Sequence, residues 1–391
     1  MILLLVIGLA GVSIYYWYRL ARRAPAANFT VPSIKWSKNF GVDQQFVTSP
    51  VLAEDGSLYI ASVLGSLYSL DSSGEKQWEY HTNEFIAGGL LRDADKNIYF
   101  TTLSKVFSLN SSGRKRWEID CPQPRMWQDD QGSAVDGNNL YTHCGKNFVA
   151  LNKNDGTKLW SNPPLDMEAA PAVLKDGTVI GVSASHLIAT DRDGNNLWKY
   201  PGESGSDAVP LDTPIAVGND GILYAGSRLS DRFVALDSHG AVQWSFRVHT
   251  QPFRSSPVIA ADGTIYAITM QQLVYAIGPD GAEKWEFQLP RLIHAENHSA
   301  PVLGSDGTIY ILAEEKLVAL SPEGQQLWEL PLPGSCGGSP ALTPDGTLYI
   351  PTIEGVLYAV QTASHGLMQS PWPRYQHDLS NSGRELGPGG R

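Results

Sequence analysis

The chain has few cysteines, few charged residues and, beyond its amino terminus, no long apolar run. Three cysteines among 391 residues are too few for a scaffold built on disulfides. Charged residues make up 18% of the chain and hydrophobic ones 42%, which excludes a disordered chain and a coiled coil. The 40 acidic residues exceed the 29 basic ones, and the net charge of -11 argues against nucleic acid as a partner.

Turn formers and large aromatic residues are plentiful instead. The chain contains 38 glycines, 25 prolines and 11 tryptophans. This combination favours short strands joined by tight turns over long helices. Length alone suggests two or three domains, but a domain built from repeats is often longer than average.

The amino terminus carries the one long apolar stretch. Residues 1–18 are uncharged, and the length of this stretch is close to the minimum for crossing a bilayer. Residues 15–18 are all aromatic, as is typical of a membrane interface. Arg19, Arg22 and Arg23 follow. We predict a transmembrane anchor over residues 1–23 and a linker over residues 24–31. A cleaved signal peptide is the alternative, although signal peptides carry their positive charge before the apolar stretch.

Two markers recur along the rest of the chain with one period. An Asp in a turn returns every 39 to 44 residues, at Asp55, Asp95, Asp136, Asp176, Asp220, Asp262, Asp306 and Asp345. A Trp returns every 38 to 46 residues, at Trp36, Trp78, Trp117, Trp160, Trp198, Trp244, Trp285 and Trp328. We interpret these as eight structural repeats.

Each repeat predicts a four-stranded unit. Apolar residues alternate around an Asp-Gly pair, which suits a two-residue hairpin turn. A unit of about 40 residues with four short strands is one propeller blade. The eighth unit has only three strands, and Pro371 and Pro373 make the following segment a poor strand. We therefore predict an all-β, eight-bladed propeller over residues 32–384, closed by an N-terminal strand over residues 34–39, with a flexible tail over residues 385–391.

The repeat resembles that of the quinoprotein-type β-propellers, named for the pyrroloquinoline-quinone dehydrogenases. The stretch from Ala150 to Trp160, ALNKNDGTKLW, is similar to the family's tryptophan-docking pattern, and WPRYQHD from Trp372 resembles a segment of bacterial members. The resemblance implies that the eight repeat tryptophans pack between neighbouring blades. The architecture is similar to that of the propeller lipoprotein of the outer-membrane barrel assembly machine, although the lipid-accepting cysteine is absent.

No cofactor or metal site is predicted. The dehydrogenases that the repeat resembles carry a disulfide between adjacent cysteines and a set of calcium ligands, whereas Cys121, Cys144 and Cys336 are far apart in sequence. We therefore do not expect pyrroloquinoline quinone to bind. The stretch 93–97, DADKN, starts like a calcium loop but lacks its Gly and Glu, so a hairpin turn is expected there. Cys121 and Cys144 either form a disulfide or remain free thiols.

The loops that enter each innermost strand should surround the mouth of the channel. Their chemistry varies while the blades stay regular, and propellers often bind ligands at this mouth. The candidate residues for binding a ligand or partner are Phe46, Phe85, Arg125, Trp127, Asp130, Glu168, Asp212, Arg254 and His298. No catalytic residue is predicted.

The leading hypothesis for function is a non-catalytic, membrane-anchored module that binds or scaffolds proteins at the bacterial cell envelope. The alternatives are a propeller enzyme, either a quinone-dependent dehydrogenase or a hydrolase or lyase at the channel mouth, and a carbohydrate-binding surface protein. The arginines after the apolar stretch favour a cytoplasmic propeller. The family resemblance implies a periplasmic one, which we expect.

Overall fold

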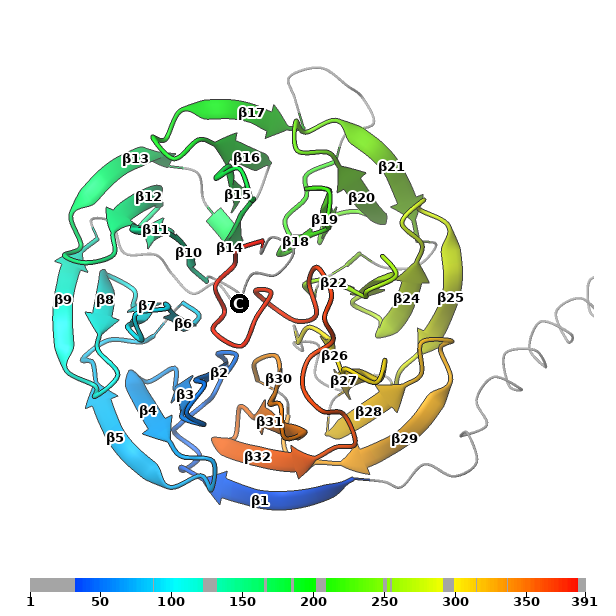
Figure 1. The fold of residues 1–391 in the computed structure, drawn as a ribbon, viewed down its shortest axis with the longest axis horizontal. Coiled ribbons are helices and arrows are strands. Elements are labelled where there is room, and N and C mark those ends of the chain that lie inside the picture. Colours follow the sequence, from blue (N-terminus) through cyan, green and yellow to red (C-terminus); the bar gives the residue numbers. More distant parts are fainter. Residues whose placement is uncertain are drawn as a thin grey trace, which may run out of the picture.

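The computed structural model describes residues 32–385 except 87, 122–131, 165–166, 184–185, 202–208, 249–251, 254, 291–298, 314 and 336. Within these residues, the strands form eight four-stranded sheets. The sheets stand as blades around a central axis (Figure 1), and neighbouring strands within each blade are antiparallel. The prediction of an all-β, eight-bladed propeller is confirmed.

Blades 1 to 4 each use four consecutive strands, given from the axis outward. Blade 1 holds β2 (Val51–Leu52), β3 (Leu58–Ala61), β4 (Ser66–Leu70) and β5 (Lys76–His81). Blade 2 holds β6 (Leu91–Arg92), β7 (Ile98–Thr101), β8 (Lys105–Leu109) and β9 (Lys115–Asp120). Blade 3 holds β10 (Ala134–Asp136), β11 (Asn139–Cys144), β12 (Asn147–Asn152) and β13 (Lys158–Pro164). Blade 4 holds β14 (Met167–Val173), β15 (Val179–Ser183), β16 (Leu187–Thr190) and β17 (Asn196–Tyr200).

Blades 5 to 7 repeat this order, and blade 8 differs. Blade 5 holds β18 (Ala216–Val217), β19 (Leu223–Gly226), β20 (Arg232–Leu236) and β21 (Val242–Arg247). Blade 6 holds β22 (Val258–Ile259), β23 (Ile265–Ile268), β24 (Leu273–Ile277) and β25 (Glu283–Gln288). Blade 7 holds β26 (Val302–Leu303), β27 (Ile309–Ala313), β28 (Lys316–Leu320) and β29 (Gln326–Pro331). Blade 8 holds β30 (Ala341–Leu342), β31 (Thr347–Pro351), β32 (Val356–Gln361) and β1 (Ser33–Asn39).

The ring is closed by strands from the two ends of the chain. β1 pairs antiparallel with β32 in a register that runs from Ser33 opposite Gln361 to Asn39 opposite Val356. The predicted closing strand is therefore confirmed. Each blade keeps a sheet edge at the axis and another at the outside of the ring, and the inner strands are short.

Seven of the eight turns that carry the repeat Asp have three residues, so the expected two-residue turn is wrong for them. It is confirmed only in blade 3, where Asp136 pairs with Asn139 across two residues. In blade 1, Ala53 donates its amide to the carbonyl of Ser57 and Gly56 donates to that of Ala53. Gly56 has a φ of +85°, while Asp55 keeps a negative φ and accepts the amide of Ser57 on Oδ1 at 3.0 Å. This is a type I turn closed by a glycine bulge, in which the Asp side chain caps the turn.

The repeat tryptophans lie between blades. Seven indole Nε1 atoms donate to a carbonyl in the outer turn of the next blade, at 2.8–3.1 Å: those of Trp36, Trp78, Trp117, Trp160, Trp198, Trp244 and Trp285. The turn glycine makes room for the ring, because a Cβ on Gly324 would lie 2.5 Å from the indole of Trp285. Trp328 precedes blade 8, where that turn is replaced by the pairing of β32 with β1.

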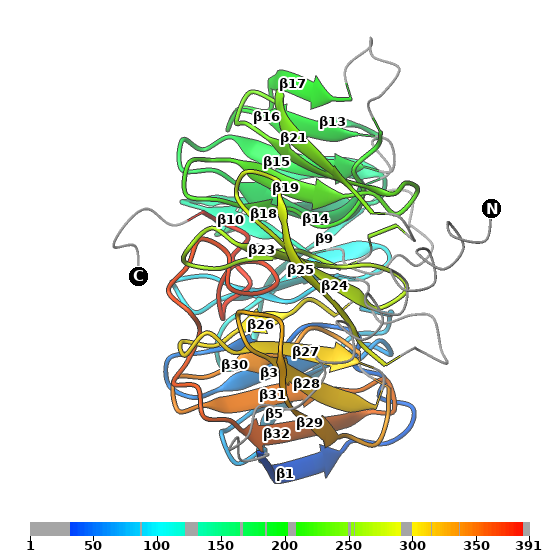
Figure 2. The same cartoon turned by 90° about the vertical axis from the view of Figure 1, so that its right-hand side faces the viewer.

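The residues after β32, which we call the C-terminal segment (residues 362–385), cross the central channel (Figure 1). Figure 2 shows this segment at one end of the ring. Six innermost strands donate a backbone amide to it at 2.8–3.1 Å: Leu52 to Leu379, Arg92 to Ser380, Val135 to Ser382, Val173 to Gly383, Ile259 to Trp372 and Leu303 to Pro373. The segment thus ties together six of the eight blades.

Side chains of the C-terminal segment fill the channel on that side. Trp372 and Arg374 have no exposed surface, and Tyr375 packs with Ala170 of blade 4 and Ala300 of blade 7. The Arg374 guanidinium donates to the carbonyl oxygens of Asp378 at 2.7 Å and of Pro50 at 3.3 Å. Burial lowers the pKa of Arg374 to about 10, so the side chain stays charged at neutral pH.

Candidate functional site

The two ends of the ring differ in chemistry. We call the end with the Asp-Gly turns and the C-terminal segment the turn face. The loop face is the opposite end, which carries the connections between blades and the turns between the second and third strands of each blade. The described residues include ten exposed large apolar side chains, and four of them lie on outermost strands. The other six all lie on the loop face: Val42, Leu64, Phe85, Leu229, Met270 and Ile353.

Four of these six residues follow one another on neighbouring loops of blades 8, 1 and 2. They are Ile353, Val42, Leu64 and Phe85, with exposed fractions of 39%, 74%, 41% and 39%. We call these four side chains the apolar arc. Exposed apolar side chains gathered on one surface are typical of a protein interaction site.

Backbone hydrogen bonds join the loops of the apolar arc in series. Ile353 donates to the carbonyl of Ser335, and Phe46 donates to that of Thr352 at 3.2 Å. Val63 then donates to Gln45 at 2.8 Å, and Ile86 donates to Val63 at 3.0 Å. Each loop is therefore held by the loop before it, so the exposed side chains stand on a fixed backbone.

The loops of the apolar arc carry negative charge. Asp43 is exposed beside Val42, Glu84 precedes Phe85, and Glu354 follows Ile353. Burial raises the pKa of Glu84, but hydrogen bonds from Ser104 and Thr102 outweigh it and lower the pKa below the usual value. This carboxylate is therefore ionised at neutral pH.

The candidate residues predicted at the mouth of the channel separate into exposed and buried positions. Phe85 is exposed and belongs to the apolar arc. Phe46 is fully buried and packs edge-on against Phe40 at 5.2 Å between ring centroids. Asp212 is buried too, and its carboxylate accepts the backbone amide of Arg228 at 2.6 Å. Burial raises the pKa of Asp212, and the charge of Arg228 offsets only part of this.

The side chains of the remaining candidate residues at the channel mouth are not described. Glu168 lies in β14, and only its backbone is described. The others lie outside the described residues: Arg125, Trp127, Asp130, Arg254 and His298. Their role in binding stays a prediction.

Val42, Leu64 and Ile353 were not among the predicted site residues. Leu64 and Ile353 lie in turns that begin with Ser or Thr and end with Gly, SVLG and TIEG. An apolar residue between such turn formers is a signal in the sequence. This signal is hard to recognise in the sequence, because the strands on either side of the turn are apolar as well.

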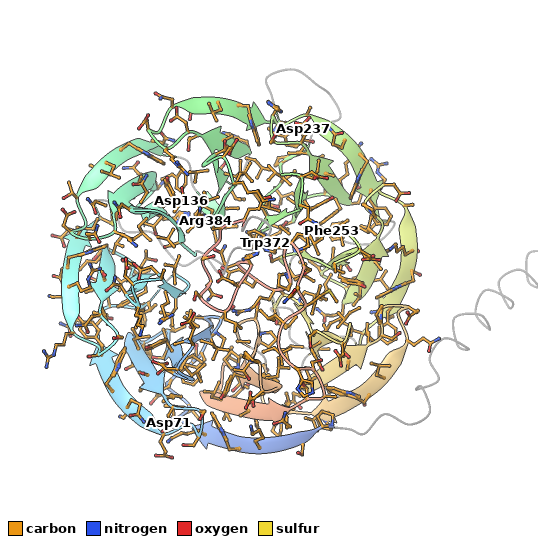
Figure 3. The ribbon with its side chains drawn as sticks, in the orientation of Figure 1. Asp71, Asp136, Asp237, Phe253, Trp372 and Arg384 are labelled. Carbon is orange, nitrogen blue, oxygen red and sulfur yellow. A yellow bond between two sulfur atoms is a disulfide. The ribbon has the colours of Figure 1, made fainter. Side chains whose placement is uncertain are left out.

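The turn face is fastened by ion pairs. Asp136, at the end of β10, is buried and lies 2.7 Å from Arg192 of blade 4 and 3.1 Å from Arg384 of the C-terminal segment. Figure 3 shows Asp136 and Arg384 beside each other near the axis. At the last residue of the C-terminal segment, the buried carboxylate of Glu385 lies 2.7 Å from Lys175 of blade 4.

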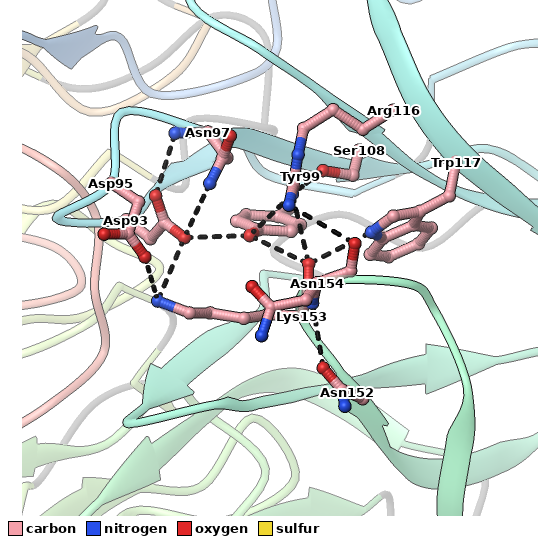
Figure 4. A network of polar contacts seen from close by, with 10 residues as sticks. All are labelled: Asp93, Asp95, Asn97, Tyr99, Ser108, Arg116, Trp117, Asn152, Lys153 and Asn154. Carbon is pink, nitrogen blue, oxygen red and sulfur yellow. Dashed lines mark hydrogen bonds and ion pairs between the residues drawn. The ribbon is translucent and has the colours of Figure 1, made fainter.

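The calcium-like stretch is a hairpin turn, as predicted, and a lysine occupies it. Lys153 of blade 3 places Nζ 2.7 Å from the carboxylate of Asp95 and 3.2 Å from that of Asp93 (Figure 4). Asp93 also accepts hydrogen bonds from Asn97 at 3.2 Å and Tyr99 at 2.8 Å. The single ammonium thus offsets part of the negative charge of the two carboxylates across the contact between blades 2 and 3.

Cys121 and Cys144 form a disulfide with their Cα atoms 4.8 Å apart. The bond connects the end of β9 in blade 2 to the end of β11 in blade 3. The two cysteines are 23 residues apart, so the bond differs from the adjacent-cysteine disulfide that the quinone dehydrogenases carry. The described residues contain no group of three or more His, Cys, Asp or Glu side chains placed to hold a metal ion. The expectation that pyrroloquinoline quinone does not bind stays a prediction.

The predicted membrane anchor, residues 1–23, lies outside the described residues. In the part of the chain that is described, no helix has the length and apolarity needed to span a membrane.

Solved structures with the same fold have varied functions. BamB from Moraxella catarrhalis matches with a TM-score of 0.67 and 19% identity over 86% of this chain and 99% of that one. A europium-containing methanol dehydrogenase matches with a TM-score of 0.67 and 12% identity, over 87% and 96%. Virginiamycin B lyase from Staphylococcus aureus matches with a TM-score of 0.56 and 12% identity, over 84% and 98%. At these identities the likeness concerns the fold alone.

Sequence comparison gives the family. No curated protein sequence matches the chain. The family model for outer membrane protein assembly factor BamB matches residues 32–200 and 184–341, which is more than half of the chain. The resemblance to quinoprotein-type propellers of this kind is thereby confirmed, and the chain belongs to the BamB family.

Proposed function

We propose that this protein is a membrane-anchored scaffold of the bacterial periplasm that binds other proteins on its loop face. The observation that carries the proposal is the distribution of exposed apolar side chains: among the described loops, all six such side chains lie on the loop face. Removing such side chains from water is the main source of affinity between proteins. Membership of a family described as an outer membrane protein assembly factor supports a role in binding proteins.

Two features support the compartment and the anchor. The Cys121–Cys144 disulfide suits an oxidising compartment, and disulfides are rare in the cytosol. The uncharged residues 1–18 with their aromatic end suit a single membrane span. Protease treatment of spheroplasts tests the location: we expect the propeller to be digested without lysis, and protection until lysis would contradict a periplasmic location.

Retention of partners from envelope extracts tests the binding function. The full-length chain in detergent should retain at least one protein, and Leu64→Asp in the apolar arc should abolish this retention. The control is Leu197→Asp, which makes the same change at an exposed leucine of β17 on the side of the ring. If the wild-type chain retains no protein, or if both variants behave alike, the proposed function is wrong.

A further inference from the structure

The apolar arc combines exposed apolar side chains with an excess of acidic residues. Its loops, residues 40–48, 62–65, 82–89 and 352–355, contain Asp43, Glu84 and Glu354 but no Lys or Arg. Glu84 accepts hydrogen bonds from hydroxyl groups and Glu354 accepts one from the amide of Ser335. These donors are neutral and leave the negative charge of both carboxylates in place. The cation that acts on Glu84 is Lys105, whose ammonium is paired with Glu118 and Asp120.

We propose that the apolar arc binds an apolar segment of another protein that carries Lys or Arg next to its apolar residues. This inference rests on the proposed function and specifies the chemistry of the partner. Apolar side chains of the segment would cover Leu64, Phe85 and Ile353, and its basic groups would face the three carboxylates. Charge complementarity of this kind selects among partners and speeds association.

The path of the chain argues against lipid as the occupant. Ser33 pairs with Gln361, whose side chain donates to the carbonyl of Asp345 in an Asp-Gly turn. The chain therefore enters the ring at the turn face, at the opposite end from the apolar arc. An anchor that precedes Ser33 joins the propeller at the turn-face end. The acidic loops would also be repelled by anionic headgroups.

Charge argues against a second copy of the chain as well. Two copies that meet through the apolar arc would bring six carboxylates together, because each copy contributes Asp43, Glu84 and Glu354. The whole chain also carries a net charge of -11, which opposes self-association. A basic segment of another protein removes this repulsion.

The fixed backbone of the arc lowers the cost of binding. The hydrogen bonds from Ile353 to Ser335, from Val63 to Gln45 and from Ile86 to Val63 hold the loops before a partner arrives. A surface that is already ordered loses little conformational entropy on association. Even a short segment can therefore bind with useful affinity.

Selection from a random-peptide phage library on the full-length chain in detergent tests the inference. We expect enriched peptides to combine large apolar residues with Lys or Arg. In fluorescence anisotropy with a selected peptide, Leu64→Asp should raise Kd by about tenfold or more, as for a central contact. Asp43→Lys should raise Kd by about threefold at low salt and by less at high salt, since surface charges are screened.

Matched controls keep the result specific to the arc. Leu197→Asp and Asp193→Lys place the same changes on exposed residues of blade 4 and should leave Kd within about twofold of wild type. Enriched peptides that are acidic or uncharged, or a Kd insensitive to Asp43→Lys, would overturn the partner chemistry while leaving the scaffold function intact. Co-sedimentation with phosphatidylglycerol vesicles that Leu64→Asp abolishes would overturn it in favour of lipid.

Discussion

Ile259, in the innermost strand of blade 6, donates its backbone amide to the carbonyl oxygen of Trp372 at 2.8 Å. The two residues also form an isolated antiparallel bridge, although β23 to β32 lie between them in sequence. The same hydrogen bond recurs between the C-terminal segment and five other innermost strands. The segment is thus part of the folded core and closes the turn face of the channel.

Truncating Trp372 should therefore destabilise the whole ring. Trp372 has no exposed surface and packs in the core cluster of blades 4 to 6. We expect Trp372→Ala to lower the free energy of unfolding by about 3–5 kcal/mol, measured by urea denaturation. Trp372→Phe keeps much of the buried ring and should cost less. A loss for Trp372→Ala below about 1 kcal/mol would show that the segment adds little to the fold.

Removing the disulfide should lower stability by about 3 kcal/mol, because Cys121 and Cys144 close a loop of 23 residues in the unfolded chain. Thermal unfolding of the double variant Cys121→Ser/Cys144→Ser measures the loss. Dithiothreitol should lower the Tm of the wild type and leave that of the double variant unchanged. The control Cys336→Ser should retain the response to the reductant. Equal Tm values for wild type and double variant would contradict this prediction.

Lys153→Met should cost about 3–5 kcal/mol, because it leaves the buried carboxylate of Asp93 without its ammonium partner. Lys38→Met is the control, since Lys38 pairs with the exposed Glu75 and should cost under about 1 kcal/mol. Both losses can be measured by urea denaturation at pH 7. Similar losses for the two variants would contradict a special role for Lys153.

The loss in Lys153→Met should also depend on pH. The hydrogen bond and charge of Lys153 lower the pKa of Asp95, so this pair stabilises the fold above the unfolded pKa of 3.8. That contribution disappears as the pH falls through the lowered pKa in the folded state. Burial lowers the pKa of Lys153, but Asp95 and Asp93 outweigh it and raise the pKa, so the lysine stays charged throughout. The gap between wild type and Lys153→Met should therefore narrow below about pH 4, and a gap that is constant from pH 7 to pH 3 would contradict this assignment.

Asp212→Asn should change the pH dependence in the opposite sense. Burial raises the pKa of Asp212, so ionising this carboxyl costs stability as the pH rises through 3.8 and then through the raised folded value. Asn keeps an oxygen that can accept the amide of Arg228. We expect the variant to be more stable than wild type at pH 7 and equal to it at low pH. A variant that is less stable at pH 7 would show that Arg228 needs the charge.

Quinone binding can be tested directly. We expect that pyrroloquinoline quinone with calcium leaves the Tm of the full-length chain unchanged. We also expect no reduction of an electron-accepting dye in a dehydrogenase assay. A ligand that binds only the folded chain raises its Tm. A rise in Tm together with dye reduction would contradict the prediction and favour the dehydrogenase alternative.

The sequence predicted the ring well because its markers are local. Trp78 and Asp55 each occupy a fixed place in a repeat, so counting them gives the blades, and the missing strand of blade 8 points to residues 34–39. The length of the turn was predicted wrongly for seven blades and correctly for blade 3, because an Asp-Gly pair fits a two-residue turn and a three-residue turn equally well.

The site was harder to predict because loops lack a period that separates inside from outside. Phe46 and Phe85 occupy comparable connections between blades, yet Phe46 is fully buried and Phe85 is exposed. The path of the C-terminal segment depends on contacts such as that between Trp372 and Ile259. These residues are far apart in sequence, so no local sequence pattern predicts the contact. Pro371 and Pro373 indicated only that the segment is not a blade strand.

Because β1 pairs with β32, the ring can close only after the last blade has been synthesised. β1 is made first, but its hydrogen-bonding partner in blade 8 is made after every other strand. During synthesis the growing chain therefore exposes the unpaired edge of β1, which can pair wrongly with another strand. Blades 1 to 7 can form as they emerge, whereas the finished toroid exists only after the last blade has been delivered. A chain that stops one blade early lacks β32, so β1 has no partner and the ring stays open.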